Sequence, residues 1–284
     1  MSAPRAVLIG ASGRMGVQIV RQLAAAIAPG QVQQAAPLRL VGAVASASSA
    51  SLGRDIGVHA GMAALGLAIA PVSQLPTLLA QADVALDFSQ GACVAAHLHD
   101  CVAANVPLLI GTTGMPAALD EHIEAAARRV AVLLAPNTSL AVNVLLELVR
   151  QAAQSLPETY DIEIVETHHR DKRDAPSGTA LALGAAAAQG RAGAPLGERT
   201  VQGRAAHDGA RQAGQIGFAS VRGGDVVGEH RVLLLGPGES LELLHRATDR
   251  AVFARGAILA AAWLAGCVAG RYAMKDYLSV NTSG

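Results

Sequence analysis

Short apolar segments alternate with alanine-rich segments of helical character through the first half of this chain. No other feature restricts the fold as strongly. The apolar segments are continuous, as expected of strands that are buried on both faces of a parallel sheet. We expect strands at residues 5–10, 38–45, 84–88, 106–111 and 130–135, with helices at 14–28, 92–104 and 116–129. The pattern predicts the α/β class, with an N-terminal doubly wound Rossmann-type domain.

The character of the sequence changes near Asn137. Glycine-rich turns join consecutive strand-like segments in the second half, which predicts an α+β domain with an antiparallel or mixed sheet. We expect helices at 140–156, from Ser177 onward and at 250–266, and strands at 160–167, 215–222, 229–235 and 240–248. Residues 190–214 are rich in Gly, Arg and Gln and are expected to form a long loop.

Composition excludes several classes of protein. The formal net charge is zero and no long basic run occurs, which argues against nucleic-acid binding. Aromatic residues make up only 2% of the chain, so the core must be aliphatic. The three cysteines, Cys93, Cys101 and Cys267, form no CxxC pair, which argues against a disulfide framework or a zinc site and suits a reducing, cytoplasmic location. No signal peptide is recognisable, and no apolar run reaches the ~18 residues of a membrane helix.

A glycine-rich turn follows the first expected strand and opens the first expected helix. Its glycines are Gly10, Gly13 and Gly16, and the turn reads Gly10-Ala11-Ser12-Gly13-Arg14-Met15-Gly16. Glycines let the backbone approach a pyrophosphate, and a helix N-terminus supplies N–H groups and positive partial charge. The spacing is G-x-x-G-x-x-G, so it is the register of strand, glycines and helix that favours dinucleotide binding over a plain turn.

Two further loops follow later strands of the predicted parallel sheet. Gly111-Thr112-Thr113-Gly114 follows the fourth, and Ala135-Pro136-Asn137-Thr138 follows the fifth. The carboxyl ends of parallel strands are where ligands bind in this architecture. The same residue types also occur in ordinary turns, so either loop alone favours neither interpretation.

The end of the second strand carries no carboxylate for the ribose hydroxyls of NAD. The sequence there is Val44-Ala45-Ser46-Ala47-Ser48, and Arg14 and Arg54 are the nearest candidates for holding a 2′-phosphate. The residues therefore leave the choice between NADH and NADPH open.

The segment 166–179 concentrates the chemistry. It contains His168, His169 and Lys172, and Lys172 and Lys275 are the only two lysines in the chain. A lysine or a histidine can exchange a proton near neutral pH, whereas an arginine cannot. Ser177 is a natural helix N-cap, and Gly178 and Thr179 would expose backbone N–H groups that hold a carboxylate or phosphate. We interpret Asp171 and Asp174 as local charge balance.

Other reactive patterns are absent from the sequence. No G-x-S-x-G and no P-loop motif occurs. His97 and His99 are two positions apart on an expected helix, so we predict no metal site there. His207, His230 and His245 show no recognisable spacing.

Five stretches together resemble the 4-hydroxy-tetrahydrodipicolinate (dihydrodipicolinate) reductase family, in the family's order and over nearly the whole chain. They are Gly10–Gly16, Asp87-Phe88-Ser89, Gly111–Gly114, the run E-T-H-H-R-D-K-x-D-A-P-S-G-T-A from Glu166, and the segments Ile216–Phe218 through Val227–His230. The run from Glu166 is the most specific of them. The chain departs from the family pattern at Ser46-Ala47, where an acidic residue is common, and at Thr138, where an aromatic residue is common.

The resemblance implies residue roles. His168 would be the acid/base residue and Lys172 a proton donor. His169, Ser177, Gly178 and Thr179 would bind the substrate. The dinucleotide would be lined by Gly10, Ala11, Ser12, Gly13, Arg14, Met15, Phe88, Gly111, Thr112, Thr113, Ala135, Pro136, Asn137 and Thr138. No metal is implied.

The resemblance also implies an activity and a domain plan. The expected activity is NAD(P)H-dependent reduction of 4-hydroxy-tetrahydrodipicolinate, a small heterocyclic dicarboxylate, to tetrahydrodipicolinate with loss of water, on the diaminopimelate route to lysine. We expect a dinucleotide-binding domain at 1–136, a substrate-binding and oligomerisation domain at 137–250, and a segment at 251–284 that returns to the first domain. A homotetramer is expected, with no nucleic-acid or membrane partner. The alternatives are a non-catalytic NAD(P)-sensing regulator and another two-domain amino-acid dehydrogenase.

Overall fold

The computed structural model describes residues 2–25, 36–191, 195–204 and 209–280, and these divide into two compact units. The first unit comprises 1–140 and 251–284, and the second comprises 141–250. None of the helices in the described parts of the chain is long and apolar enough to cross a membrane.

The first unit contains a seven-stranded sheet in which every strand pair is parallel. The spatial order is β12-β6-β5-β4-β1-β2-β3. Its strands are β1 (Arg5–Ile9), β2 (Arg39–Ala45), β3 (Ala70–Pro71), β4 (Val84–Asp87), β5 (Leu108–Ile110), β6 (Ala131–Leu134) and β12 (Gly270–Tyr272). The order reverses between β1 and β4, and such a reversal marks where ligands bind in doubly wound sheets.

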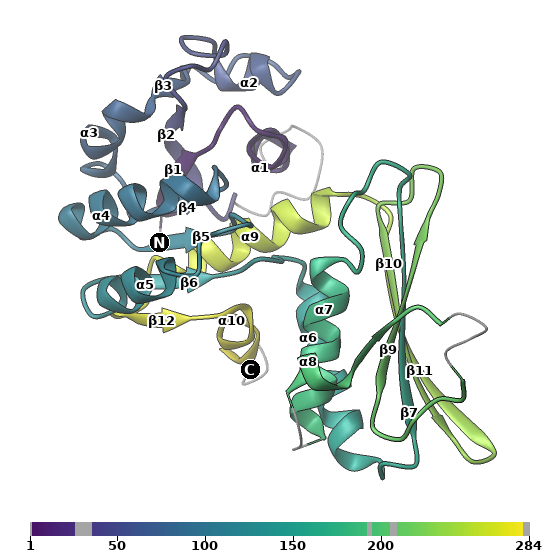
Figure 1. Cartoon of the computed structure of the whole chain (residues 1–284). Helices are drawn as coiled ribbons and strands as arrows, with labels where there is room; N and C mark the ends of the chain where they lie inside the picture. The colour runs from purple at the N-terminus through teal and green to yellow at the C-terminus, as the bar shows by residue number, and fades with distance from the viewer. Residues whose placement is uncertain (1, 26–35, 192–194, 205–208, 281–284) are drawn as a thin grey trace. The chain divides into compact units, whose positions relative to one another are not determined.

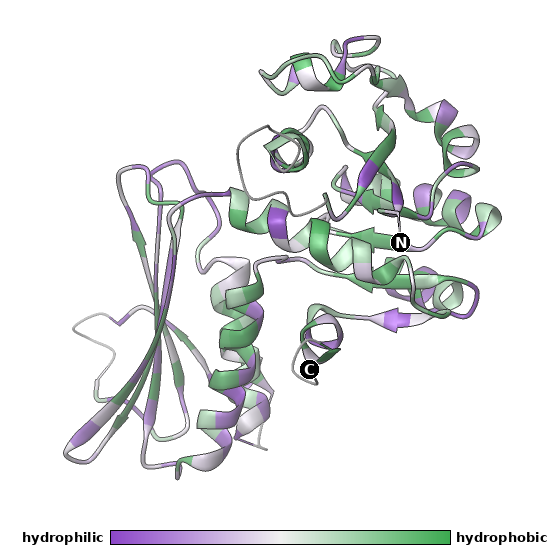
Figure 2. Cartoon of the chain, turned by 180° about the vertical axis from the view of Figure 1, so that it is seen from behind, coloured by the Kyte–Doolittle hydropathy of each residue, from purple (hydrophilic) through white to green (hydrophobic). Residues whose placement is uncertain are grey.

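Helices cover both faces of this sheet (Figure 1). The helices of the unit are α1 (Arg14–Ala25), α2 (Ile56–His59), α3 (Leu75–Leu79), α4 (Val94–Ala104), α5 (Leu119–Ala127), α9 (Ala251–Leu264) and α10 (Met274–Val280), with 3₁₀ turns η1 (Val72–Gln74) and η2 (Gly91–Cys93). One apolar core joins the sheet to α1 and α9, and the second joins it to α3, α4 and α5. Figure 2 shows α9 as predominantly hydrophobic, which fits its buried position.

The second unit is a five-stranded mixed sheet with helices on one face (Figure 1). Its order is β11-β10-β7-β9-β8, antiparallel through β11, β10 and β7 and parallel through β7, β9 and β8. The strands are β7 (Asp161–His168), β8 (Thr200–Gln202), β9 (Ile216–Arg222), β10 (Gly228–Gly236) and β11 (Glu239–Ala247), and the helices are α6 (Leu140–Ser155), α7 (Gly178–Gly190) and α8 (Leu196–Arg199). Its core lies between the sheet and α6 and α7.

The predicted fold class is confirmed, and most expected elements are present within a few residues. The long loop expected at 190–214 is wrong in part, because α8 and β8 lie inside it. Residues 192–194 and 205–208 of that segment, residues 26–28 of the first expected helix, and His207 fall outside the described residues. The elements that we did not expect are α2, β3, α3, β12 and α10 with the 3₁₀ turns, which are too short to show a clear periodicity.

Candidate functional site

His168 and the carboxylate of Glu166 lie close together at the end of strand β7. Alternate residues of β7 are buried toward the helices, from Ile162 through Ile164 and Glu166 to His168. Nδ1 of His168 is hydrogen-bonded to Oε2 of Glu166. Glu166 is fully buried, and 8% of His168 is exposed. The two residues therefore form a nearly buried ionisable pair at the strand's carboxyl end.

Arg222 completes this pair from the end of the neighbouring strand β9. Its Nη1 and Nη2 donate to the two oxygens of Glu166 at 2.8 and 2.7 Å. The backbone N–H of Ser177 donates to Glu166 Oε1 at 3.2 Å. Burial alone would raise the pKa of Glu166, but the hydrogen bonds from Arg222, Ser220 and His168 outweigh burial and lower that pKa to about 2. Glu166 is therefore ionised throughout the physiological range.

The charge state of His168 follows from its surroundings. Burial lowers the pKa of its imidazole, and the positive charges of Lys172 and Arg222 act in the same direction. Glu166 opposes them, and the net result is a pKa below the ordinary value. Because Glu166 is an ionised acceptor, Nδ1 of His168 carries a hydrogen and Nε2 is the nitrogen that gains or loses the titrating proton.

His230 packs against His168, a contact that we did not predict from the sequence. It lies on β10 opposite Glu166, its ring is 5.1 Å from that of His168, and its Nε2 is 3.2 Å from Oγ of Ser177. Burial lowers the pKa of His230 to about 4, with a contribution from the charge of His168. A signal was available, because His230 is the polar member of the otherwise apolar buried face of β10.

The turn after β7 holds the predicted proton donor. Nζ of Lys172 lies 2.8 Å from both carboxylate oxygens of Asp174, in agreement with our interpretation of Asp174 as local charge balance. Strand β7 ends at His168, so His169 is the first residue of the turn, where its side chain is half-buried. The backbone N–H of Gly223 donates to His168 O, which fixes this turn against the β9–β10 connection.

The predicted substrate cradle is the N-terminus of α7. Ser177 is its N-cap, and its Oγ accepts from the backbone N–H of Ala180 at 3.2 Å. Gly178 is exposed, and a Cβ built on it would have no atom of the chain within 4 Å. Thr179 is half-buried beside it. The N-terminus of this helix is thus open at Gly178, and helix N-termini favour anions.

In the first unit, the glycine turn after β1 is built for close backbone contact. Gly10 has φ +82°, and a Cβ on it would lie 2.5 Å from the carbonyl oxygen of Phe88. The backbone N–H groups of Gly10 and Ala11 both donate to Val44 O at 3.0 Å, and that of Gly13 donates to Gly10 O. This geometry requires glycine at position 10 and presents the first turn of α1, whose N–H groups have no partner within the helix, at the edge of the sheet.

The other predicted cofactor residues in this turn differ in exposure. Ala11 is buried, Ser12 and Met15 are half-buried, and Gly13 and Arg14 are exposed at the start of α1. Exposed backbone at a helix N-terminus is what a dinucleotide phosphate requires, so the residues fit the group that the motif implies.

Residues of the loops after β4 and β5 lock together. The ring of Phe88 packs directly on Gly111, where it occupies the position that a Cβ would take. Thr112 Oγ1 donates to the main-chain oxygen and to Oδ1 of the fully buried Asp87, both at 3.1 Å. His97 Nδ1 lies 2.8 Å from the other oxygen of Asp87. The hydroxyl of Thr112 is thus committed to the protein, whereas Thr113 is exposed.

In the loop after β6, side-chain groups are likewise hydrogen-bonded to other parts of the protein. The hydroxyl of Thr138 donates to Phe253 O at 2.7 Å, which ties the loop to α9. Oδ1 of Asn137 accepts from the backbone N–H of Ser139 at 2.9 Å. Ala135 is buried and its N–H donates to Ile110 O, while Pro136 follows it in the loop. The hydroxyl hydrogens of Thr112 and Thr138 are therefore committed to the protein and do not donate to a cofactor.

The predicted residues gather in two groups, one in each unit. The predicted cofactor residues follow β1, β4, β5 and β6, neighbouring strands whose carboxyl ends share one sheet edge. The predicted catalytic and substrate residues share the end of β7, its turn and the start of α7. Among the residues that the structure describes, no group of three His, Cys, Asp or Glu side chains is arranged to hold a metal ion.

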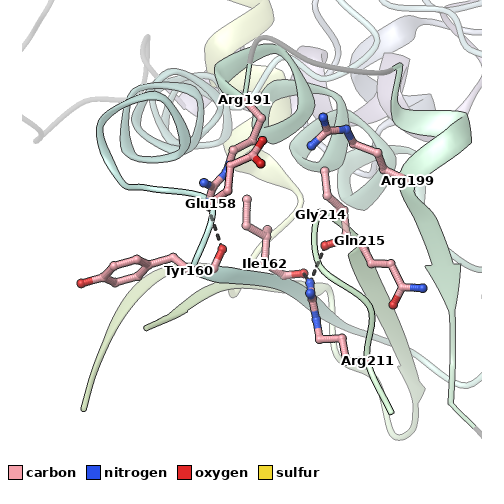
Figure 3. Close-up of a pocket in the computed structure, with 9 residues that line it drawn as sticks. Glu158, Tyr160, Ile162, Arg191, Arg199, Arg211, Gly214 and Gln215 are labelled. Carbon is pink, nitrogen blue, oxygen red and sulfur yellow. Dashed lines mark hydrogen bonds between the residues drawn. The ribbon is translucent and has the colours of Figure 1, made fainter. Parts of the chain in front are cut away.

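A separate small pocket lies at the opposite end of β7 (Figure 3). Ile162, in its wall, is six residues from His168, or about 20 Å along the strand. Arg211 is held there by Asp161 at 2.6 Å and Glu163 at 3.1 Å, and Arg191 donates to Tyr160 O at 2.8 Å. The remaining lining residues are Glu158, Arg199, Gly214, Gln215 and Ile216. These contacts fasten the segment before β9 to the start of β7, far from His168.

Comparison with known proteins agrees with this arrangement. The family model described as "Dihydrodipicolinate reductase, N-terminus" matches residues 4–138, and "Dihydrodipicolinate reductase, C-terminus" matches 141–278. The chain is 48% identical over 276 residues to the 4-hydroxy-tetrahydrodipicolinate reductase of Anaeromyxobacter dehalogenans (strain 2CP-1 / ATCC BAA-258), covering 97% of this chain and 98% of the relative. It is 46% identical to that of Brucella abortus (strain 2308), covering 97% and 99%.

A solved structure shares the fold. It is the dipicolinate-bound dihydrodipicolinate reductase from Paenisporosarcina sp. TG-14, with a TM-score of 0.70, 24% sequence identity, and coverage of 95% of this chain and 97% of that one.

The dinucleotide-type sheet and the second unit, together with these matches, define the class as oxidoreductases that use NAD(P)H. Within that class, the chain belongs to the dihydrodipicolinate reductase family, whose members are the 4-hydroxy-tetrahydrodipicolinate reductases of lysine biosynthesis. The resemblance drawn from the sequence motifs is confirmed, and with it the expected activity and cofactor type.

Proposed function

We propose that this chain carries out the family's reaction through a proton delivered by His168. The reaction is the NAD(P)H-dependent conversion of 4-hydroxy-tetrahydrodipicolinate to tetrahydrodipicolinate with loss of water. The observation that carries the proposal is the Glu166–His168 pair beside the N-terminus of α7, because it provides an imidazole of fixed orientation next to an anion-binding helix end.

The first unit binds the dinucleotide in this proposal. Its pyrophosphate would be held by the backbone of the Gly10–Met15 turn, and the loops at Gly111–Thr113 and Ala135–Thr138 would line the dinucleotide. When bound, the reduced nicotinamide supplies the hydride. Phe88 packs on Gly111 in this region.

The second unit binds the substrate. A ring carboxylate is held by the backbone N–H groups of Gly178 and Thr179, with Ser177 fixing the helix end and His169 at the side. The ligand named for the Paenisporosarcina structure, dipicolinate, is a heterocyclic dicarboxylate of this kind. Binding through fixed N–H groups orients the ring, and orientation lowers the barrier to hydride transfer.

His168 donates the proton from Nε2, and Lys172 is the second donor. Lys172 must release Asp174, which lies in the same exposed turn, to reach the substrate. Its positive charge near the α7 N-terminus also favours the binding of a dianion.

The assay is oxidation of NADPH or NADH in the presence of the heterocyclic substrate. His168→Gln should lower kcat by about 10²–10⁴-fold with an unchanged Kd for the cofactor. His99→Gln, at a histidine whose side chain is 82% exposed, is the matched control. A near-normal kcat in His168→Gln would remove the imidazole from the proton-donor role. Wild-type turnover in Lys172→Ala would remove Lys172 in the same way.

Two further proposals concern the oligomeric state of the protein and its location in the cell. We infer a cytoplasmic homotetramer that pairs through the face of the five-stranded sheet turned away from α6 and α7. That face carries Val221, 48% exposed, and Leu244, 48% exposed, together with Val165 and Leu233. The three cysteines are all free thiols, which suits a reducing compartment. Light scattering coupled to gel filtration tests the tetramer, and Val221→Glu with Leu244→Glu should yield smaller species.

A further inference from the structure

We propose that Glu166 and Arg222 are positioning residues for His168: the carboxylate fixes which imidazole nitrogen exchanges protons, and the guanidinium cancels the charge that this requires. The inference deepens the proposed function and rests on it for the catalytic consequence. Its structural part can be tested without turnover.

The arrangement is fixed by three neighbouring strands. Glu166 and His168 lie on one face of β7, Arg222 lies beside His168 in the register of β9, and His230 lies beside Glu166 in the register of β10. Arg222 also donates to Asp174 O at 2.7 Å, so the guanidinium links the strand ends to the Lys172 turn. All of these side chains are at most half exposed at the sheet end, where packing limits their movement.

Glu166 without Arg222 would make His168 a poor proton donor, because His168 must lose its proton and regain it in every turnover. An unpaired buried Glu166 would hold the imidazole as imidazolium, because the attraction between them is strong away from water. The bidentate contact of Arg222 with Glu166 makes the carboxylate and guanidinium neutral as a unit. The hydrogen bond to Nδ1 remains, so orientation and tautomer are kept while Nε2 stays free to lose its proton.

Three other ionisable groups lie near this arrangement. Lys172 in the following turn is positively charged, and His230 on β10, with His245 beyond it on β11, is kept neutral by burial. Among the described groups that act most strongly on His168, Glu166 supplies the carboxylate. Arg222, which binds both oxygens of Glu166, sets the influence of that carboxylate.

The experiment follows the imidazole of His168 by ¹⁵N NMR across pH, in histidine-labelled protein, with the resonance assigned by its loss in His168→Gln. In the wild type, Nδ1 should carry the hydrogen at every pH. Glu166→Gln should lower the pKa of His168, because the positive charge of Arg222 is then uncompensated, and should add the other tautomer. Arg222→Gln should raise the same pKa, because Glu166 is then unopposed. The alkaline limb of the kcat profile should move in the same two directions, and kcat should fall at least about tenfold in Glu166→Gln.

The controls separate positioning from folding. Glu163→Gln removes a carboxylate from the opposite face of the same strand and should leave the His168 resonance unchanged. Arg222→Lys keeps the charge without the two-pronged contact and should move the pKa less than Arg222→Gln. Thermal unfolding establishes that each variant is folded.

Opposite shifts in the two variants support the inference, and shifts in the same direction or none overturn it. The proposed function fails separately, if kcat survives His168→Gln while the NMR shifts occur as expected.

Discussion

The Nε2 atom of His168 lies 3.1 Å from the point that a Cβ on Gly228 would occupy. Gly228 begins β10 and faces the same side of the sheet as His230. The absence of a side chain at position 228 therefore leaves room beside the nitrogen that we assign to proton transfer.

Gly228→Ala should lower kcat by crowding Nε2, with little change in cofactor Kd. Because the added carbon would lie only 3.1 Å from Nε2, the imidazole would have to shift by a few tenths of an ångström. Gly197→Ala is the matched control, since a Cβ there meets nothing within 4 Å. Steady-state kinetics of the two variants is the measurement. An unchanged kcat in Gly228→Ala would show that this space is not needed.

Gly178→Ala should raise the KM for the heterocyclic substrate while leaving the free energy of unfolding unchanged or slightly higher. Within the protein the added methyl group meets no atom within 4 Å, and alanine is a better helix former than glycine. Only a bound ligand would be obstructed. Urea unfolding and substrate titration are the two measurements, and an unchanged KM would place the carboxylate elsewhere.

The stability of the second unit should depend on pH through His230. The folded pKa of about 4 lies below the ordinary 6.5, so the unfolded chain binds more protons between these values. Stability is therefore fully present above pH 6.5 and is lost as the pH falls toward 4, by up to about 3 kcal/mol. His230→Asn should flatten the change in urea midpoint between pH 7.5 and pH 5, and an equally steep change would contradict the assignment.

Thr112→Val should cost about 1–3 kcal/mol of stability and weaken cofactor binding. The hydroxyl joins the loop after β5 to the buried Asp87, and valine leaves that carboxylate with one donor fewer. Thr77→Val, at an exposed position of α3, controls for the loss of a surface hydroxyl. If denaturant unfolding gives the same free energy of unfolding for both variants, the hydrogen bond from Thr112 to Asp87 contributes nothing to stability.

Ser46→Asp should shift the ratio of kcat/KM for NADH over NADPH upward. Ser46 is exposed at the end of β2, where dinucleotide folds that select NAD carry a carboxylate for the ribose hydroxyls. The introduced charge would also repel a 2′-phosphate. Because each variant is compared with itself on two cofactors, folding effects cancel, and an unchanged ratio would place the adenine ribose away from Ser46.

The class of fold and the position of most elements could be predicted from residue patterns alone. Continuous apolar runs at β1, β4 and β6 left few alternatives to buried parallel strands, and Ser177 marked a helix start because its hydroxyl can cap one. Elements such as α8 and β12 were not predicted. Their four and three residues, respectively, carry too little periodicity to distinguish them from a loop.

The residues that surround His168 are brought together by the fold. Arg222 and His230 are 54 and 62 positions away in the chain and reach the imidazole only because β9 and β10 flank β7 in this register. Strand order and register depend on packing between distant segments, which no local pattern of side chains encodes. The chemical groups could thus be named from the sequence, whereas the charge balance that sets their protonation required the fold.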